Sequence, residues 1–262
     1  MDISQADLED LHYAKSLLEH PGLAAKFVNI IGTPVEKGFD FLPSGWKNVV
    51  ASSTQKALQV AVNSAVLTLG KATKPNAANT LHKLMAAGSG AAGGFWGLPA
   101  LPLELPISTT IMLRSIADIG RSEGQSLKDP RVKLACIEVF ALGGRSKDDD
   151  AVESGYFTIR SALAKVINEA TQHLTRQGLN AKSSPVLIKL IAQISSRFGV
   201  QVSEKIAAQA IPIIGAAGGA VINTLFIDHF QAMARGHFIV LRLEQKYGRE
   251  MVRQTYDAIN EK

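Results

Sequence analysis

Residues 206–227 read IAAQAIPIIGAAGGAVINTLFI, and none of these twenty-two residues carries a charge. The GAAGG run at 215–219 occurs a second time at 90–94, inside another uncharged window of twenty residues, 84–103. Either window is long enough to span a bilayer, which takes about 20 apolar residues, but both contain proline and several glycines. Glycine and alanine at helical spacing let two helix backbones approach closely. We therefore expect the two runs to pack on each other as a central helix pair, with a membrane-inserted hairpin as the alternative.

The rest of the chain follows a helical rather than an alternating period, which predicts an all-α fold without a sheet. The prolines of GFWGLPALPLELPISTT, residues 94–110, should prevent a continuous helix, so the next helix is expected to start near Ser108. No polar linker is long enough to separate two units, so residues 1–262 are expected to form one multi-helix bundle domain. The expected helices span 5–19, 46–70, about 82 to the first GAAGG run, 108–124, 130–143, 151–177, a segment ending at Gly199, about 220–247, and a short stretch from Arg249.

Composition indicates a folded protein with much buried or membrane-facing surface. Apolar residues make up 46% and charged residues 19% of the chain, and the second value is below the usual ~25%. The net charge is +5 and the isoelectric point is about 9.3. Lys and Arg are scattered, without the basic block typical of nucleic-acid binding. We therefore expect no nucleic-acid partner, and the mildly basic balance fits contact with an anionic membrane surface.

Cys136 is the only cysteine, so the chain has no internal disulfide, which suits a reducing compartment. Its apolar neighbours, LACIEVF, predict a buried hydrophobic residue rather than a reactive thiol. The N-terminus, MDISQADLEDLHYAK, has neither the basic region nor the apolar core of a secretory signal. The expected location is the cytoplasm, with peripheral association at the inner membrane.

Charged residues with strongly apolar flanks are the candidate binding residues. Arg114 and Asp118 lie in IMLRSIADI, and Asp228 and Arg235 lie in LFIDHFQAMARGHF. Partly buried charges need partners, so these four residues are expected to form either structural ion pairs or a polar site at the bottom of an apolar cleft. Two charges further along the same helices are interpreted as parts of solvated faces: Arg121 and Arg242.

No pattern for metal, nucleotide or phosphate binding is present. The six histidines form neither HxxxH nor HExxH, and one cysteine cannot complete a zinc site of the usual kind. The acids at 148–150 lack the spacing of a calcium loop, and GSGAAGG lacks a preceding strand and the GxGxxG pattern. We expect no metal and no cofactor.

Two long blocks of the chain resemble the EcsC proteins. The first is GAAGGFWGLPALPLELPISTTIMLRSIADIGRSEG, residues 90–124, followed by VFALGG, and the second is IPIIGAAGGAVINTLFIDHFQAMARGHFIVLRLEQKYG, residues 211–248. The resemblance covers most of the chain and implies a bacterial protein of this family. The family is named for a neighbour of an ABC-transporter operon and has no settled activity. The resemblance therefore implies a transporter-linked membrane protein as a partner, and it passes on no catalytic residue.

The resemblance also bears on two candidate site residues. The acid after the first Gly/Pro block is typically Asp in the family, whereas the nearest match here is Glu104, shifted among additional Leu-Pro residues. The position of Arg114 matches directly. The resemblance therefore supports a functional role for Glu104 less specifically than one for Arg114.

Two functions are open at this point. The first is a non-enzymatic accessory protein that binds a lipid, an acyl chain or a membrane-associated partner through an apolar cleft near the Gly/Ala helices. The second is a hydrolase in which Glu104, Asp118 and Asp228 surround a polar pocket with Arg114. Paired acids can act as general acid and general base when burial separates their pKa values. The hydrolase hypothesis requires Asp118 and Asp228 to converge on one concave site.

Overall fold

The computed structural model describes residues 3–19, 22–68, 98–143, 155–177, 184–211 and 215–259. Every element in these ranges is a helix and none is a strand, which confirms the prediction of an all-α fold. The elements, with η marking a 3-10 helix, are α1 Gln5–Glu19, α2 Leu23–Ile31, η1 Val35–Phe41, α3 Trp46–Thr68, η2 Leu98–Ala100, α5 Leu101–Ser122, α6 Pro130–Glu138, η3 Val139–Ala141, α7 Tyr156–Gln177, α8 Pro185–Ala210, α9 Gly215–Tyr247 and α10 Arg249–Ala258.

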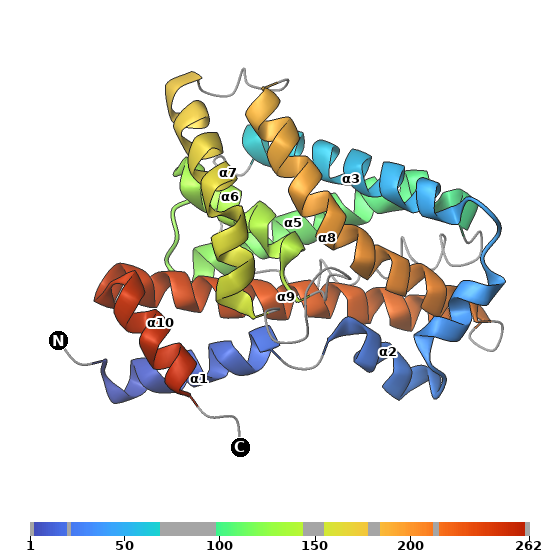
Figure 1. The fold of residues 1–262 in the computed structure, drawn as a ribbon, viewed down its shortest axis with the longest axis horizontal. Helices are drawn as coiled ribbons and strands as arrows, with labels where there is room; N and C mark the ends of the chain where they lie inside the picture. The colour runs from blue at the N-terminus through green and yellow to red at the C-terminus, as the bar shows by residue number, and fades with distance from the viewer. Residues whose placement is uncertain are drawn as a thin grey trace.

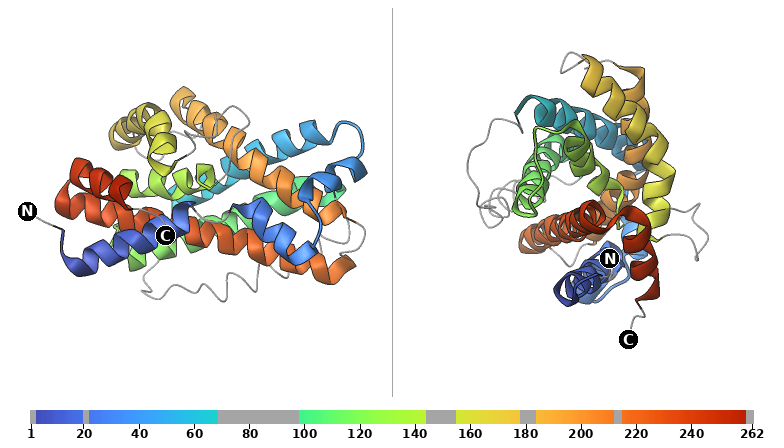
Figure 2. Two further views of the ribbon diagram at one scale, coloured as in Figure 1. Left: turned by 60° about the horizontal axis from the view of Figure 1, so that its bottom comes forward. Right: turned by 90° about the vertical axis from the view of Figure 1, so that its left-hand side faces the viewer.

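The helix α9, 33 residues long, forms the axis of the bundle. In Figure 1 it runs along the molecule, with α1 and α2 on one side and α3, α5 and α8 on the other, while α10 folds back at one end. Figure 2 shows α5 at the edge of the bundle, with α3 and α9 on its inner side. Among the described helices, both faces of α9 are therefore covered, whereas α5 has neighbouring helices on one side.

The helices α5 and α9 lie side by side and run in the same direction. Near the middle of α5, the side-chain amide of Gln231 donates a hydrogen bond of 2.7 Å to the hydroxyl of Ser115. Further along α9 and just beyond the end of α5, the amide of Gln245 donates to Gln125 at 3.0 Å. Because the residue numbers of both partners rise together, the helices are parallel. Both begin at the right-hand end of the molecule in Figure 1.

The buried apolar residues form one core cluster that includes side chains from α1 to α9 and continues into α10. At its centre four phenylalanine rings contact one another at centroid distances of 5.0–6.1 Å: Phe140, Phe198, Phe226 and Phe230. Cys136 is fully buried beside this core, and burial raises the pKa of its thiol to about 12. The prediction of a buried cysteine is confirmed.

The start of α5 differs from the prediction that the prolines exclude a helix before Ser108. The helix begins at Leu101 and includes Pro102 and Pro106. Pro102 stands in the first turn, where an N–H group would have no partner inside the helix. Pro106 lies deeper and removes one backbone hydrogen bond, but α5 as a whole packs closely against α3 and α9. Tertiary packing therefore outweighs the local cost of the second proline.

Two other helix boundaries also differ from the sequence prediction. Gly199 does not end a helix but lies inside α8, where nothing stands within 4 Å of the position that a Cβ atom would occupy. The helix expected at 151–177 begins at Tyr156. In both cases the type of element is correct and its end is displaced.

The second GAAGG run opens α9, and the first run lies outside the described residues. The expected packing of the two runs on each other therefore stays a prediction. The window 206–227 is not one helix, because α8 ends at Ala210 and α9 begins at Gly215. No helix in the described part of the chain is long and apolar enough to cross a membrane.

Candidate functional site

Glu104, the acid suggested by the family pattern, lies in a buried ion pair. Its carboxylate is 2.7 Å from the ammonium of Lys205 on α8, and the Lys205 side chain is fully buried. The same ammonium lies 5.2 Å from the centre of the Phe226 ring on α9. The pair therefore joins three helices at the end where α5 and α9 begin. Removing one partner alone would leave an uncompensated buried charge.

The other predicted site residues occupy different surroundings. Asp118 forms an ion pair of 3.0 Å with Arg121, one turn later on α5, so pairing along the helix is observed there. Asp228 is half-buried on α9 and lies near Lys26 of α2. Burial lowers the pKa of Lys26, and the charge of Asp228 acts in the opposite direction. Arg114 is exposed on α5, and Arg235 is half-buried on α9.

The carboxylates of Asp118 and Asp228 stand at different levels of the parallel pair. Ser115 and Gln231 mark one level, because their side chains are hydrogen-bonded. Asp118 comes three residues after this level and Asp228 three residues before it. At about 1.5 Å of rise per residue, the two positions are roughly 9 Å apart along the helix axes.

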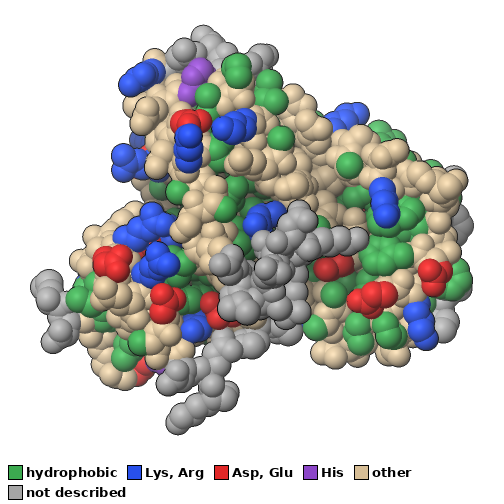
Figure 3. Space-filling view, viewed as in Figure 1, with side chains coloured by type: hydrophobic (Ala, Val, Ile, Leu, Met, Phe, Trp, Pro, Cys, Tyr) green, Lys and Arg blue, Asp and Glu red, His purple; other side chains and the backbone are tan. Residues whose placement is uncertain are grey.

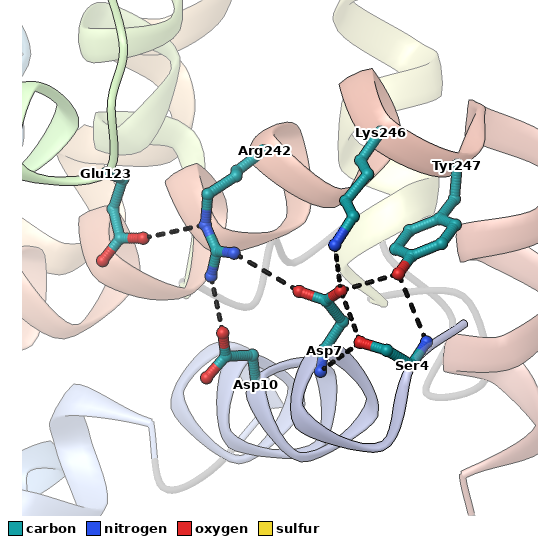
Figure 4. A network of polar contacts seen from close by, with 7 residues as sticks. All are labelled: Ser4, Asp7, Asp10, Glu123, Arg242, Lys246 and Tyr247. Atoms are coloured by element: carbon teal, nitrogen blue, oxygen red, sulfur yellow. Dashed lines mark hydrogen bonds and ion pairs between the residues drawn. The ribbon is translucent and has the colours of Figure 1, made fainter.

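Arg242 corrects one prediction, because it is not part of a solvated face. It links three helices (Figure 4), with ion pairs of 2.7 Å to Asp10, 3.6 Å to Asp7 and 3.3 Å to Glu123, the residue that follows α5. Asp7 also accepts hydrogen bonds from Lys246 at 2.6 Å and from other donors in Figure 4. The hydrogen bond from Lys246 is the main reason why the pKa of Asp7 lies well below its ordinary value. This network fastens α1 to the C-terminal half of α9.

The side of α5 that faces solvent is apolar over its first three turns. Leu103 is 74% exposed and Ile107 is 56% exposed, while Ile111, one turn further, is partly buried. Between Leu98 and Leu113 the only charged residue is Glu104, which points into the protein. We call the outward side chains of this half-helix the α5 outer face: Pro102, Leu103, Pro106, Ile107, Thr110, Ile111 and, at its end, Arg114.

The inward side of the same half-helix buries polar groups beside apolar side chains such as Leu101 and Leu105. Ser108, Thr109 and Ser115 are fully buried together with Glu104. The only polar side chain within the outer face before its arginine is that of Thr110, whose hydroxyl donates to the carbonyl oxygen of Pro106 at 2.8 Å. Before Arg114, the α5 outer face therefore presents no side-chain group that needs a hydrogen-bond partner.

A buried group of five polar side chains lies at the opposite end of α9, and we call it the His237 cluster: Glu138, Tyr156, Arg160, His237 and Glu244. The Tyr156 hydroxyl is 2.8 Å from Nδ1 of His237, and the Glu138 carboxylate is 3.8 Å from Nε2. Arg160 binds Glu244 through two hydrogen bonds of 2.7 and 3.0 Å. The cluster thus joins α6, α7 and α9.

Burial shifts the acid–base properties of this cluster. It raises the pKa of Glu138 to about 7, although the charge of Arg160 acts in the opposite direction. Burial also lowers the pKa of His237 well below its ordinary value, and Arg160 adds to this shift. Glu138 and His237 are therefore both neutral in mildly acidic solution. The arrangement can hold a proton inside the protein without an unpaired charge.

A second buried histidine, His229, lies two turns before His237 on α9. Gln201 of α8 donates to the carbonyl oxygen of Leu142 at 2.6 Å and lies 3.4 Å from Nε2 of His229. Gly143 adopts a positive φ of 73° here, and a Cβ atom at this position would lie 2.7 Å from the histidine ring. Burial lowers the pKa of His229 to about 3, with a further contribution from the charge of Lys26. A glycine is therefore required where the chain passes this ring.

The described side chains around these two histidines do not form a metal site. Among the residues that the structure describes, no three His, Cys, Asp or Glu side chains are placed to hold a metal ion together. On the face seen in Figure 3, Lys and Arg side chains are spread among acidic ones. The electrostatic pattern of this face is mixed, as the scattered positive residues of the sequence predict.

The sequence-based reasoning missed the His237 cluster. LACIEVF and RGHFIV were interpreted through their apolar residues, whereas Glu138 and His237 are the polar exceptions within them. An ionisable residue inside an otherwise apolar helical stretch is a usable signal, because it must find a buried partner. The identity of the partner depends on long-range packing, which a single helix does not reveal.

A family model described as EcsC protein family matches residues 5–243 of the chain. The matched range contains α5 and most of α9, and it ends before α10. No curated protein and no solved structure matches the chain.

Proposed function

The chain belongs to the EcsC family, and we propose that it is a non-enzymatic accessory protein that binds the surface of an anionic membrane through the α5 outer face. The observation that carries this proposal is the exposed apolar side of α5. Leu103 and Ile107 are exposed on the outside, while Glu104 and Ser108 are buried on the inside. A contiguous apolar face on a surface helix is typical of an interaction site.

The chemistry of the face supports a lipid rather than a protein as the partner. Protein interfaces usually contain about one hydrogen bond per 100–200 Å². The only polar group within this apolar face, the hydroxyl of Thr110, already donates to the carbonyl oxygen of Pro106. Arg114 stands at the end of the face, where a guanidinium can bind a lipid phosphate. The net charge of +5 adds attraction to an anionic surface.

The expected binding is weak and reversible. Full transfer of a leucine or isoleucine side chain from water contributes about 1.5–3 kcal/mol, and one arginine near an anionic surface contributes about 1 kcal/mol. Leu103, Ile107 and Arg114 together therefore provide several kcal/mol at most. This is enough for peripheral association and far below the insertion energy of a membrane-spanning helix.

The alternative function, a hydrolase, requires Glu104, Asp118 and Asp228 to serve one pocket. Glu104 is paired with Lys205 and Asp118 with Arg121, and each pair has its own surroundings. These contacts favour structural roles for Glu104 and Asp118.

Co-sedimentation with phospholipid vesicles tests the proposal. The wild-type protein is expected to bind vesicles that contain phosphatidylglycerol and to bind pure phosphatidylcholine more weakly. The double variant Leu103→Glu/Ile107→Glu should reduce the bound fraction by about tenfold or more, because it places two charges where the apolar contact forms.

Ile188→Glu provides the matched control. Ile188 is an isoleucine of α8 that is 48% exposed, outside the α5 outer face. Its replacement should leave vesicle binding unchanged. Absence of wild-type binding, or equal loss of binding in the control and the double variant, would contradict the proposal.

A further inference from the structure

The first turn of α5, residues 101–105, is weakly tied to the rest of its own helix. Ala100, the residue before the helix, provides no side-chain hydrogen bond as a cap. Pro106 has no N–H group, so it cannot form the helical hydrogen bond to the carbonyl oxygen of Pro102. The backbone therefore holds this turn less firmly than the later turns of α5, and contacts with other helices define its orientation.

Apolar side chains alone define this orientation poorly. Leu101 and Leu105 are fully buried, whereas Leu103 is 74% exposed and Ile107 is 56% exposed. Burial of a leucine or an isoleucine stabilises a fold by a similar amount wherever it occurs along the turn. A turn rotated so that Leu103 and Ile107 face the protein would bury a comparable apolar area. The polar contacts of α5 therefore decide between the two orientations.

Glu104 makes the polar contact that depends on the orientation of the first turn. Its carboxylate is 2.7 Å from the ammonium of Lys205, which is fully buried on α8. Among the residues that the structure describes, Glu104 is the only hydrogen-bond partner of this ammonium, and the centre of the Phe226 ring lies 5.2 Å from it. Rotation of the turn would withdraw the carboxylate and leave a buried ammonium without a counter-charge, which is strongly unfavourable.

A second polar contact holds α5 at a later level. The hydroxyl of Ser115, about three turns after Glu104, accepts a hydrogen bond of 2.7 Å from Gln231 of α9. The hydroxyl groups between these levels make no such contact in the described part of the chain, because Ser108 donates to a carbonyl oxygen of α5 itself and Thr109 has no hydrogen-bond partner. The ion pair of Glu104 is thus the polar tie between the first turn and a neighbouring helix.

We propose that the buried pair of Glu104 and Lys205 positions the membrane-binding surface, because it holds the first turn of α5 with Leu103 facing outward. Glu104 is a positioning residue and does not contact the lipid itself. This inference rests on the proposed function, in which Leu103 and Ile107 enter the membrane. The orientation of the first turn, however, is measurable without lipid.

A buried ion pair is suited to this role. Taking both charges out of water costs about as much as their attraction returns, so an apolar pair of similar volume often gives equal or higher stability. The pair contributes mainly by penalising arrangements in which the two charges are separated. The methionine pair, Glu104→Met/Lys205→Met, is therefore expected to fold and to lose the defined orientation of the first turn.

Thiol labelling in lipid-free solution tests this orientation. Leu103→Cys places a thiol at an exposed position, and Leu105→Cys places one at a buried position of the same turn. With the native ion pair, a polar maleimide should react much faster at position 103 than at position 105. In the methionine pair the ratio of the two rates is expected to fall about tenfold or more, because the turn then covers position 103 or uncovers position 105.

Two further variants separate positioning from general destabilisation. The exchanged pair, Glu104→Lys/Lys205→Glu, keeps opposite charges at the same two positions and should retain the native labelling ratio. Ser115→Ala removes the hydrogen bond with Gln231 at the later level and should leave the ratio unchanged. Thermal unfolding identifies the folded variants. Should the methionine pair not fold, Glu104→Gln removes the charge, keeps the shape of the side chain and should lower the ratio about threefold.

An unchanged ratio in the folded methionine pair, or in Glu104→Gln where that variant takes its place, would overturn the inference. An equal fall of the ratio in Ser115→Ala would do the same.

Vesicle co-sedimentation then connects the orientation of the turn with binding. The variant with the lowered labelling ratio should bind phosphatidylglycerol vesicles several-fold to about tenfold more weakly than the wild type. A lowered ratio with undiminished binding would overturn the inference. Absence of wild-type binding would contradict the proposed function, and the labelling ratio would still decide whether the ion pair positions the turn.

Discussion

Glu138 illustrates how one buried side chain makes the stability of a helical bundle depend on pH. Its carboxyl lies within an apolar stretch of α6, and its nearest basic nitrogen is Nε2 of His237. Burial without a fully formed ion pair favours the neutral acid. The folded protein therefore holds a proton at this position that the unfolded chain releases.

The contribution of Glu138 to the free energy of unfolding is expected to fall as the pH rises from about 4.5 to about 7. The reason is that its folded pKa of about 7 lies above the ordinary value of 4.5. Its protonated form stabilises the fold fully below pH 4.5, and this contribution is lost as the pH rises through 7. The loss is roughly 2–3 kcal/mol if the shift is fully realised. Urea denaturation of the wild type and of Glu138→Gln at several pH values measures it, because the difference in stability, wild type minus variant, should decrease as the pH rises.

Glu204 provides the control for this measurement. Its pKa is also raised to about 7, first by burial and second by the charge of Glu36, so Glu138→Gln removes only part of the slope. Glu138→Gln/Glu204→Gln should remove the remainder. His229 and His237 act in the opposite direction at low pH, because their lowered pKa values make the fold less stable as the pH falls below 6.5. Identical profiles for the wild type and both variants would contradict this account of Glu138.

Among the helices, α1 and α9 show how a glycine positions one element on another. Gly236 lies where α1 crosses α9, and a Cβ atom there would lie 2.7 Å from Cγ of Leu18 and 3.0 Å from the carbonyl oxygen of Ala14. The polar network around Arg242 then fastens the other end of α1 (Figure 4). Close backbone approach at one end and ion pairs at the other define the position of α1.

Gly236→Ala should destabilise the protein by about 1–3 kcal/mol, because the added methyl group meets backbone as well as side-chain atoms of α1. Gly199→Ala is the matched control. Gly199 also lies inside a helix, but a Cβ atom there meets nothing within 4 Å. The control should gain up to about 1 kcal/mol from the higher helix propensity of alanine. Thermal unfolding compares the two, and a Gly236→Ala variant as stable as the control would disprove the close contact.

The sequence predicts the helical class and the positions of most described helices, because the apolar period is long and regular in α1, α3 and α9. It misplaces the start of α5, because proline propensity is local and the packing of α3 and α9 is not. It also assigns Arg242 to solvent, since its partners Asp10 and Glu123 are more than a hundred residues away in the chain. The outer face of α5 is visible in the sequence only as an apolar stretch that contains Glu104, and burial decides which of its residues face outward.

Across the molecule as a whole, the parallel arrangement of α5 and α9 separates two kinds of surroundings. The helices begin together at the end that carries the exposed Leu103 and Ile107. At the other end lie the ion pairs of Arg242 and the buried His237 cluster. We expect the first end to contact the membrane and the second to remain in water.

The most direct test of membrane contact is the depth of labelled side chains measured by electron paramagnetic resonance. Cys136 is buried and its thiol has a pKa of about 12, so it should not react with a nitroxide label, and single-cysteine labelling needs no background substitution. Labels at Leu103→Cys and Ile107→Cys, with Ile188→Cys as the control, report contact with oxygen in lipid and with a nickel chelate in water. On anionic vesicles we expect the labels at 103 and 107 to gain oxygen contact and lose nickel contact, while the label at 188 stays in water. Labels at 103 and 107 that remain as accessible to nickel as the label at 188 would contradict membrane binding through the α5 outer face.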